Sequence, residues 1–165
     1  MSRWLSIFFG VGLMRPAPGT WGSAAAILLG LMIDRTFGVF ALLGATVAIT
    51  ALGFWACGRE LRDRPGADPG EIVIDEVAGQ WIALLFPAFA FWHRGLDDWA
   101  YVAWPGWVAA FLFFRLFDIW KPWIIGWADR REDAAGVMLD DLIAGVFAGF
   151  AVMLAAGIAH GVLLR

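Results

Sequence analysis

Long apolar runs alternate with short polar segments along the chain, and their lengths predict membrane-spanning helices. A helix needs about 20 apolar residues to cross the ~30 Å hydrocarbon core of a bilayer. Four runs approach or reach that length, at Thr36–Cys57, Ile72–Trp92, Trp99–Phe117 and Asp141–Leu164. A fifth run, Trp21–Ile33, is shorter and would cross only where the bilayer thins or flanking residues extend the helix. We therefore expect about four to five hydrophobic spans.

The segments between these runs predict the rest of the chain. Trp4–Met14 is apolar but short and is followed by prolines, which favours an interfacial or partly buried helix. Asp34-Arg35 predicts a tight turn, and Gly58–Glu71 predicts a polar loop. No linker or internal repeat is visible in the sequence, so we expect a single membrane-embedded domain over residues 1–165.

The composition confirms that lipid is the main environment of this chain. Its 165 residues are 61% hydrophobic and 16% charged, with a mean hydropathy of +0.73. Soluble domains are closer to half apolar and a quarter charged. The net charge of -3 gives no basic field, so we expect the bilayer, and no nucleic acid, as a partner.

The two charged loops, 58–71 and 118–140, must share one side of the membrane because two predicted spans separate them. Both loops are rich in basic residues. These are Arg59, Arg62, Arg64, Lys121, Arg130 and Arg131. The excess of Lys and Arg in cytoplasmic loops predicts that both face the cytoplasm.

Five carboxylates lie at the edges of the spans that enter or leave this same face. They are Asp75, Glu76, Asp118, Asp140 and Asp141. Each would cost about 2.5–3.5 kcal/mol at the bilayer centre and less near the interface. Such a group persists when it is protonated, paired with a cationic side chain or bound to a metal ion. Hard oxygen ligands without a Cys/His cluster favour Mg²⁺ over Zn²⁺, so the sequence predicts a Mg²⁺ site at the cytoplasmic face.

The pair Asp140-Asp141 has two interpretations. Adjacent residues on a helix point about 100° apart, so one carboxylate can face a metal while the other caps the helix. Alternatively, the pair only caps the helix and interacts with its dipole.

The acids of the second span also have two interpretations. Asp75 and Glu76 could bind a metal, or they could form salt bridges with Arg115 or Arg59 that hold two spans together. Gln80 lies one helical turn after Glu76 and could hydrogen-bond either a ligand or Glu76 itself.

Two further features suit a phosphate group. The turn Arg15–Ser23 contains two prolines and two glycines, and Thr20 or Ser23 could open a helix whose N-terminus binds an anion. The same residues could be ordinary helix caps. Arg115 and Lys121 could clamp a phosphate or neutralise the nearby acids, and Lys121 could also anchor the span at the interface.

Three sequence blocks together resemble the phosphatidylglycerophosphatase A family. The blocks read PAPGTWGS, IVIDEVAGQW and FRLFDIWKPW…GVMLDDLIAG, and they lie between Arg15 and Gly145. The resemblance implies an all-α fold. It also implies a Mg²⁺-dependent phosphatase of the bacterial inner membrane, which removes the terminal phosphate of phosphatidylglycerophosphate and leaves phosphatidylglycerol.

These observations give a hypothesis for the site. The expected catalytic carboxylates and main Mg²⁺ ligands are Asp75, Glu76, Asp118 and Asp141, with Asp140 as a further ligand. One carboxylate could instead act as the base or the nucleophile. The expected phosphate contacts are Arg115, Lys121, Thr20 and Ser23.

Two other classes of protein fit part of the pattern. Acids within spans often mark ion paths, so an ion-coupled transporter is the main alternative. The acids gather at one face, however, and no row of polar residues continues to the other. A non-catalytic partner in a lipid-synthesis complex is the third possibility. A Cys-based phosphatase loop is absent, because Asp63 and not Arg occupies the sixth position after Cys57.

Overall fold

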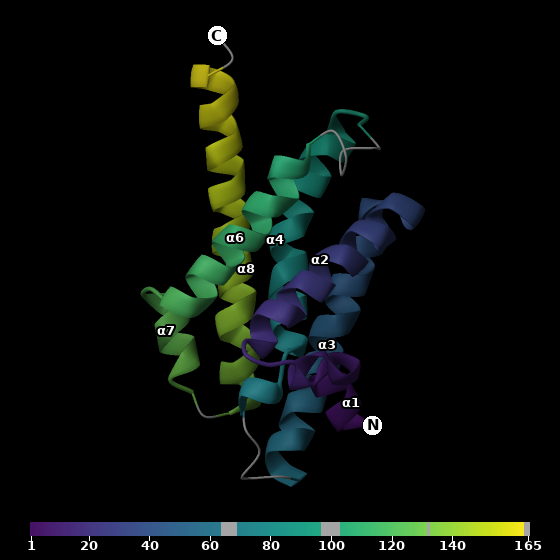
Figure 1. The fold of residues 1–165 in the computed structure, drawn as a ribbon, viewed down its shortest axis with the longest axis vertical. Helices are drawn as coiled ribbons and strands as arrows, with labels where there is room; N and C mark the ends of the chain where they lie inside the picture. Colours follow the sequence, from purple (N-terminus) through teal and green to yellow (C-terminus); the bar gives the residue numbers. More distant parts are fainter. Residues whose placement is uncertain (64–68, 97–102, 132, 164–165) are drawn as a thin grey trace.

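The computed structural model describes residues 1–63, 69–96, 103–131 and 133–163, and its regular elements there are all helical (Figure 1). This confirms the predicted all-α fold. The α-helices are α1 (Ser2–Ser6), α2 (Pro18–Phe37), α3 (Val39–Asp63), α4 (Ile74–His93), α6 (Trp104–Trp120), α7 (Ile124–Asp129) and α8 (Ala134–Ile158). The 3₁₀ turns are η1 (Phe8–Leu13) and η2 (Pro69–Glu71), and the π-helical turn η3 (Ala159–Leu163) extends α8.

Three helices of the described residues are long and apolar enough to cross a membrane. They are α3, α4 and the stretch Ala134–Gly161, which contains α8. The other two predicted spans correspond to α2 and α6, which do not meet both conditions. α2 has 20 residues but a polar first turn and Asp34-Arg35 near its end. α6 has 17 residues, and the predicted start of its span at Trp99 lies outside the described residues. The chain is thus a helical membrane bundle.

Several helices extend further than the hydropathy pattern predicts. α2 continues through Asp34-Arg35, and the chain turns at Gly38, where φ is +84°. The prediction of a turn at Asp34-Arg35 was therefore wrong. α3 continues to Asp63, inside the predicted polar loop. Arg64, which belongs to the same predicted loop, lies outside the described residues. Hydropathy marks where lipid ends, whereas polar residues with good helix propensity carry a helix on into water.

α4 is the central helix of the bundle, and it packs against α2, α3, α6 and α8 (Figure 1). Its side chains are mostly buried, as those of Val77, Leu84 and Ala88 illustrate. Large apolar side chains on the outer helices are instead exposed, among them Val47 of α3 and Phe150 and Leu154 of α8. An exposed apolar surface of this kind matches lipid rather than water.

Glycines allow α4 and α8 to approach closely. A Cβ added to Gly145 of α8 would lie 3.0 Å from the Cα of Gly79, and one added to Gly79 would lie 2.9 Å from the carbonyl carbon of Asp141 on α8. Small residues at such crossings let two backbones touch within a membrane. This contact places the first turn of α4 beside the second turn of α8.

Candidate active site

Three carboxylates meet where α4 and α8 begin. Asp75 and Glu76 lie in the first turn of α4, and Asp141 lies in the second turn of α8. Each offers an oxygen atom, and these oxygens lie within 4.8 Å of one another. We call these three residues the carboxylate cluster. Asp75 and Asp141 are 8% and 3% exposed, so bulk water does not screen their mutual repulsion.

The carboxylate cluster fits a hard divalent cation. All of its donors are carboxylate oxygens, which Mg²⁺ and Ca²⁺ prefer. Oε2 of Glu76 is buried and has no hydrogen-bond partner within the described residues. The backbone N–H of Glu76 donates to Oδ1 of Asp75 over 3.0 Å. A bound cation would supply the missing partner of Glu76 and balance the gathered negative charge.

The alternative interpretation of Asp75 and Glu76, as halves of salt bridges, does not match the observed ion pairs. Arg115 pairs with Asp118, with Nη1 and Oδ2 2.5 Å apart. Arg59 pairs with Asp63 at 3.4 Å on the exposed end of α3. Neither arginine forms an ion pair with the carboxylate cluster in the described part of the chain.

Arg115 and Asp118 border the carboxylate cluster. Asp118 is close enough to Glu76 and Asp141 to interact with both electrostatically. Arg115 reaches from α6 towards α2, and its Nη1 lies 3.5 Å from Oγ of Ser23. Its Nε is buried and has no partner within the described residues. Arg115 therefore retains a free donor beside the acids, as an anion-binding arginine requires.

Asp140 belongs to a different set of contacts. Nζ of Lys121 lies 2.8 Å from Oδ2 of Asp140 and also hydrogen-bonds Oδ1 of Asp129. We call Lys121, Asp129 and Asp140 the lysine network. Burial by itself would lower the pKa of Lys121, but its hydrogen bonds to Asp129 and Asp140 outweigh burial and raise that pKa above its ordinary value. The sequence predicted Asp140 as a ligand and Lys121 as a phosphate contact, and it did not identify Asp129.

The interpretation of Asp140-Asp141 as helix caps is wrong, because α8 begins six residues earlier, at Ala134. Asp133 caps the helix and accepts a hydrogen bond from the backbone N–H of Gly136 over 2.8 Å. The hydrogen bond from Arg131, followed by that from Gly136, lowers the pKa of Asp133 to about 2. Asp140 and Asp141 are thus interior residues of α8 that point in different directions.

The start of α2 also differs from the predicted cap. The helix begins at Pro18 and has no side-chain cap. Oγ of Ser23 donates to the carbonyl of Gly19 over 2.8 Å inside the helix, where it contacts Arg115. Thr20 is half-buried and makes no side-chain hydrogen bond in the described part of the chain. Gly19 lies against Glu76 and Arg115, because an added Cβ would clash with Glu76 and sit 3.1 Å from Nη1 of Arg115.

Gln80 is a further polar residue on the same helix as the cluster. Its side chain is completely buried, and neither amide atom has a partner within the described residues. The expected alternative, a hydrogen bond to Glu76, is therefore not present. In the sequence, Gln80 is identifiable as a candidate site residue because it lies one helical turn after Glu76.

The comparisons with known proteins agree with the three sequence blocks. The sequence model of the family described as phosphatidylglycerophosphatase A matches residues 4–156. A phosphatidylglycerophosphatase A of Haemophilus influenzae is 37% identical over 87% of this chain and 82% of its own length. That of Escherichia coli is 37% identical over 86% of this chain and 76% of its own length.

A third relative carries a different name. It comes from Bacteroides thetaiotaomicron, is 36% identical over 84% of this chain and 83% of its own length, and is named provisionally as a phosphatidylinositol-3-phosphatase. No solved structure matches the chain. The family model covers the parts of α4, α6 and α8 that carry the site, and the chain belongs to the phosphatidylglycerophosphatase A family.

Proposed function

We propose that this protein is a Mg²⁺-dependent phosphatase that hydrolyses the terminal phosphomonoester of phosphatidylglycerophosphate to phosphatidylglycerol and phosphate. The carboxylate cluster, buried beside Arg115 at one end of a membrane bundle, carries this proposal. The names of the family and of two relatives support the substrate. They do not favour the alternative of an ion-coupled transporter.

The site offers the parts that the reaction needs. Phosphomonoesters are among the hardest esters to hydrolyse, and enzymes accelerate their hydrolysis by up to ~10²¹. When bound, Mg²⁺ supplies charge neutralisation for the phosphoryl oxygens and a template for in-line attack. Asp75, Glu76 and Asp141 would hold it, with Asp118 next to them.

The chain's own residues would then bind the phosphate and move the proton. Arg115 holds the phosphoryl oxygens, and its ion pair with Asp118 fixes its orientation. A carboxylate of the cluster accepts a proton from the attacking water. The bond from the water oxygen to phosphorus forms, the bond from phosphorus to the glycerol oxygen breaks, and the leaving oxygen takes up the proton that the carboxylate accepted.

We further propose that the protein lies in the bacterial inner membrane with this site facing the cytoplasm. The relatives are bacterial. The beginnings of α4 and α8 and the end of α6 lie towards one end of the bundle (Figure 1). Arg59, Arg62, Lys121, Arg130 and Arg131 belong to the segments at that end. Basic residues at one face favour the cytoplasmic side.

Phosphate release by the purified protein in detergent tests the activity. We expect release from phosphatidylglycerophosphate with Mg²⁺ and none with EDTA. Asp75→Asn should abolish release and weaken Mg²⁺ binding measured by calorimetry. Asp63→Asn is the matched control, because Asp63 is exposed and lies outside the site.

The outcomes separate the activity from the residue assignment. No release by the wild type with any divalent cation would overturn the proposed activity. Full turnover by Asp75→Asn would overturn the ligand assignment and leave the activity standing. Faster release from phosphatidylinositol 3-phosphate than from phosphatidylglycerophosphate would reassign the substrate.

A further inference from the structure

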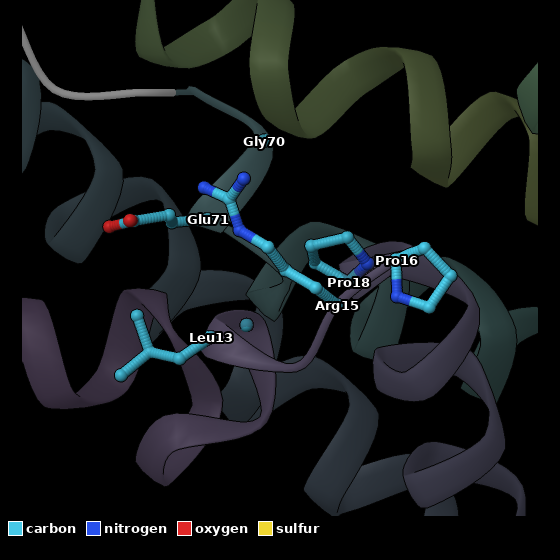
Figure 2. A pocket seen from close by; sticks show the side chains of 7 residues that line it. Leu13, Arg15, Pro16, Pro18, Gly70 and Glu71 are labelled. Atoms are coloured by element: carbon cyan, nitrogen blue, oxygen red, sulfur yellow. The ribbon is translucent and has the colours of Figure 1, made fainter.

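A pocket with an unpaired arginine lies next to the carboxylate cluster, outside the residues assigned above. It has a volume of about 200 Å³, far above the ~10–15 Å³ that one water needs. Figure 2 shows the side chains that line it, including Leu13, Arg15, Pro16, Pro18, Gly70 and Glu71. The pocket therefore has room for a polar group of a ligand.

Arg15 provides the charge of this pocket. Its guanidinium group lies beside Gly70 and Glu71 (Figure 2). Arg15 makes no ion pair in the described part of the chain, whereas Glu71 pairs with Arg3 at 3.5 Å. Because Arg3 balances the charge of Glu71, the charge of Arg15 is available to an anion. The first turn of α2, which begins at Pro18, adds a dipole end that favours negative charge.

Two chain segments connect the pocket to the carboxylate cluster. Pro18 lines the pocket, and the next residue, Gly19, lies against Glu76 and Arg115. On the other wall, Glu71 precedes Asp75 by four residues. The two lining segments pack directly against each other, because a Cβ added to Gly12 would lie 3.1 Å from the carbonyl carbon of Glu71. An anion in the pocket is thus a neighbour of a phosphate at the cluster.

The pocket also has an apolar rim. Leu13 lines it and is 50% exposed. Met14, which follows Leu13, and Phe9, four residues before it, are exposed as well. A basic group beside exposed apolar side chains suits the point where a phospholipid headgroup joins its diacylglycerol part. That point is a phosphodiester.

We infer that the Arg15 pocket binds the phosphodiester of a lipid whose terminal phosphomonoester lies at the carboxylate cluster. This inference rests on the proposed function and adds a second subsite to it. In phosphatidylglycerophosphate, one glycerol unit separates the diester from the monoester, which matches two adjacent sites. The pocket thereby selects lipids with two phosphates over phosphatidic acid, whose only phosphate is a monoester.

Lipid binding to the full chain in detergent, followed by tryptophan fluorescence, tests the subsite separately from catalysis. Phosphatidylglycerol carries the diester alone, and phosphatidic acid carries the monoester alone. We expect Arg15→Gln to weaken binding of phosphatidylglycerol about 10-fold or more, the range of a lost charge-assisted hydrogen bond. Binding of phosphatidic acid should be unchanged. Arg15→Lys, which keeps the charge but loses the planar fork, should give an intermediate loss.

Kinetics provide the second measurement. Arg15→Gln should raise the KM for phosphatidylglycerophosphate by a similar factor and leave kcat unchanged. Arg59→Gln is the matched control, because it removes the same charge from an exposed pair on α3 and should change neither value. Equal thermal unfolding temperatures of the variants and the wild type would exclude misfolding.

Three results would overturn the inference. They are unchanged phosphatidylglycerol binding in Arg15→Gln, equal weakening for both lipids, and displacement of phosphatidylglycerol by inorganic phosphate, which would reassign the pocket to the free ion. Arg15-dependent binding without phosphate release would support the subsite and contradict the proposed activity. Phosphate release without any Arg15 effect would do the opposite.

Discussion

Asp140 and Asp141 are neighbours on α8, yet their carboxylates lie in opposite electrostatic surroundings. Asp140 lies in the lysine network, where the ammonium group of Lys121 sits between two acids. Asp141 lies in the carboxylate cluster, where the neighbouring arginine, Arg115, is already paired with Asp118. The lysine network thus has its own cation. Among the described residues no cation pairs with the carboxylate cluster, which is the property of a site that recruits a metal ion.

The largest effect on activity should come from neutralising Asp141, and neutralising its neighbour Asp140 provides the comparison. Loss of a residue that only hydrogen-bonds a metal ligand lowers metal affinity or activity about 10–100-fold. Asp141→Asn removes a proposed ligand itself, so it should lower kcat and Mg²⁺ affinity by more than this. Asp140→Asn should remain within or below that range. Phosphate release and calorimetry measure the two quantities. Equal losses of kcat and Mg²⁺ affinity in the two variants would contradict the assignment of Asp141 to the carboxylate cluster and Asp140 to the lysine network.

A smaller effect should follow from separating α4 and α8 while keeping every charge. Gly145→Ala places a Cβ against Gly79, and overpacking of this kind costs about 1–3 kcal/mol. It should also lower activity, because the same contact places Asp141 beside Asp75.

Gly157 provides the control on the same helix. It has open space around it, so Gly157→Ala should be neutral or stabilise by about 0.5–1 kcal/mol. Thermal unfolding and phosphate release by the two variants test the pair. Equal unfolding temperatures for both would contradict the close packing at Gly145.

The smallest effect on catalysis should come from the lysine network. Lys121→Gln leaves the 7% exposed carboxylate of Asp140 without its cation, which should cost about 1–3 kcal/mol of stability. Adding Asp140→Asn should recover part of this loss, as expected for residues in direct contact. A double-mutant cycle of unfolding free energies measures the coupling. A higher KM for the lipid in Lys121→Gln with unchanged stability would instead make Lys121 a phosphate contact, as the sequence predicts.

The sequence predicts that the start of α4, the end of α6 and the start of α8 lie at one face of the membrane. This prediction depends only on the number of spans between them. Spans must alternate sides, so the start of one, the end of the next and the start of the last reach the same face. The alternation of spans thus predicts that Asp75, Glu76, Asp118 and Asp141 lie in one region. Run lengths also predicted α3, α4 and α8 closely enough to place these residues.

The helix boundaries could not be predicted in the same way. The apolar run at the end of the chain begins at Asp141, but α8 begins at Ala134 with Asp133 as its cap. Hydropathy is silent about polar turns that continue a helix. The apolar run therefore suggests Asp140 and Asp141 as caps, although both lie inside the helix.

The sequence by itself determined that this is an all-helical membrane protein of one family with acids gathered at one face. Composition and the lengths of the apolar runs determine the helical membrane fold and the face at which the acids lie. The three sequence blocks determine the family. Only the tertiary structure decided which acids share a site, which bind Lys121, and that the Arg15 pocket adjoins the cluster. The rotation of α8 about its axis decides the partners of Asp140 and Asp141. That rotation is set by the contact between Gly79 and Gly145, two residues far apart in the sequence.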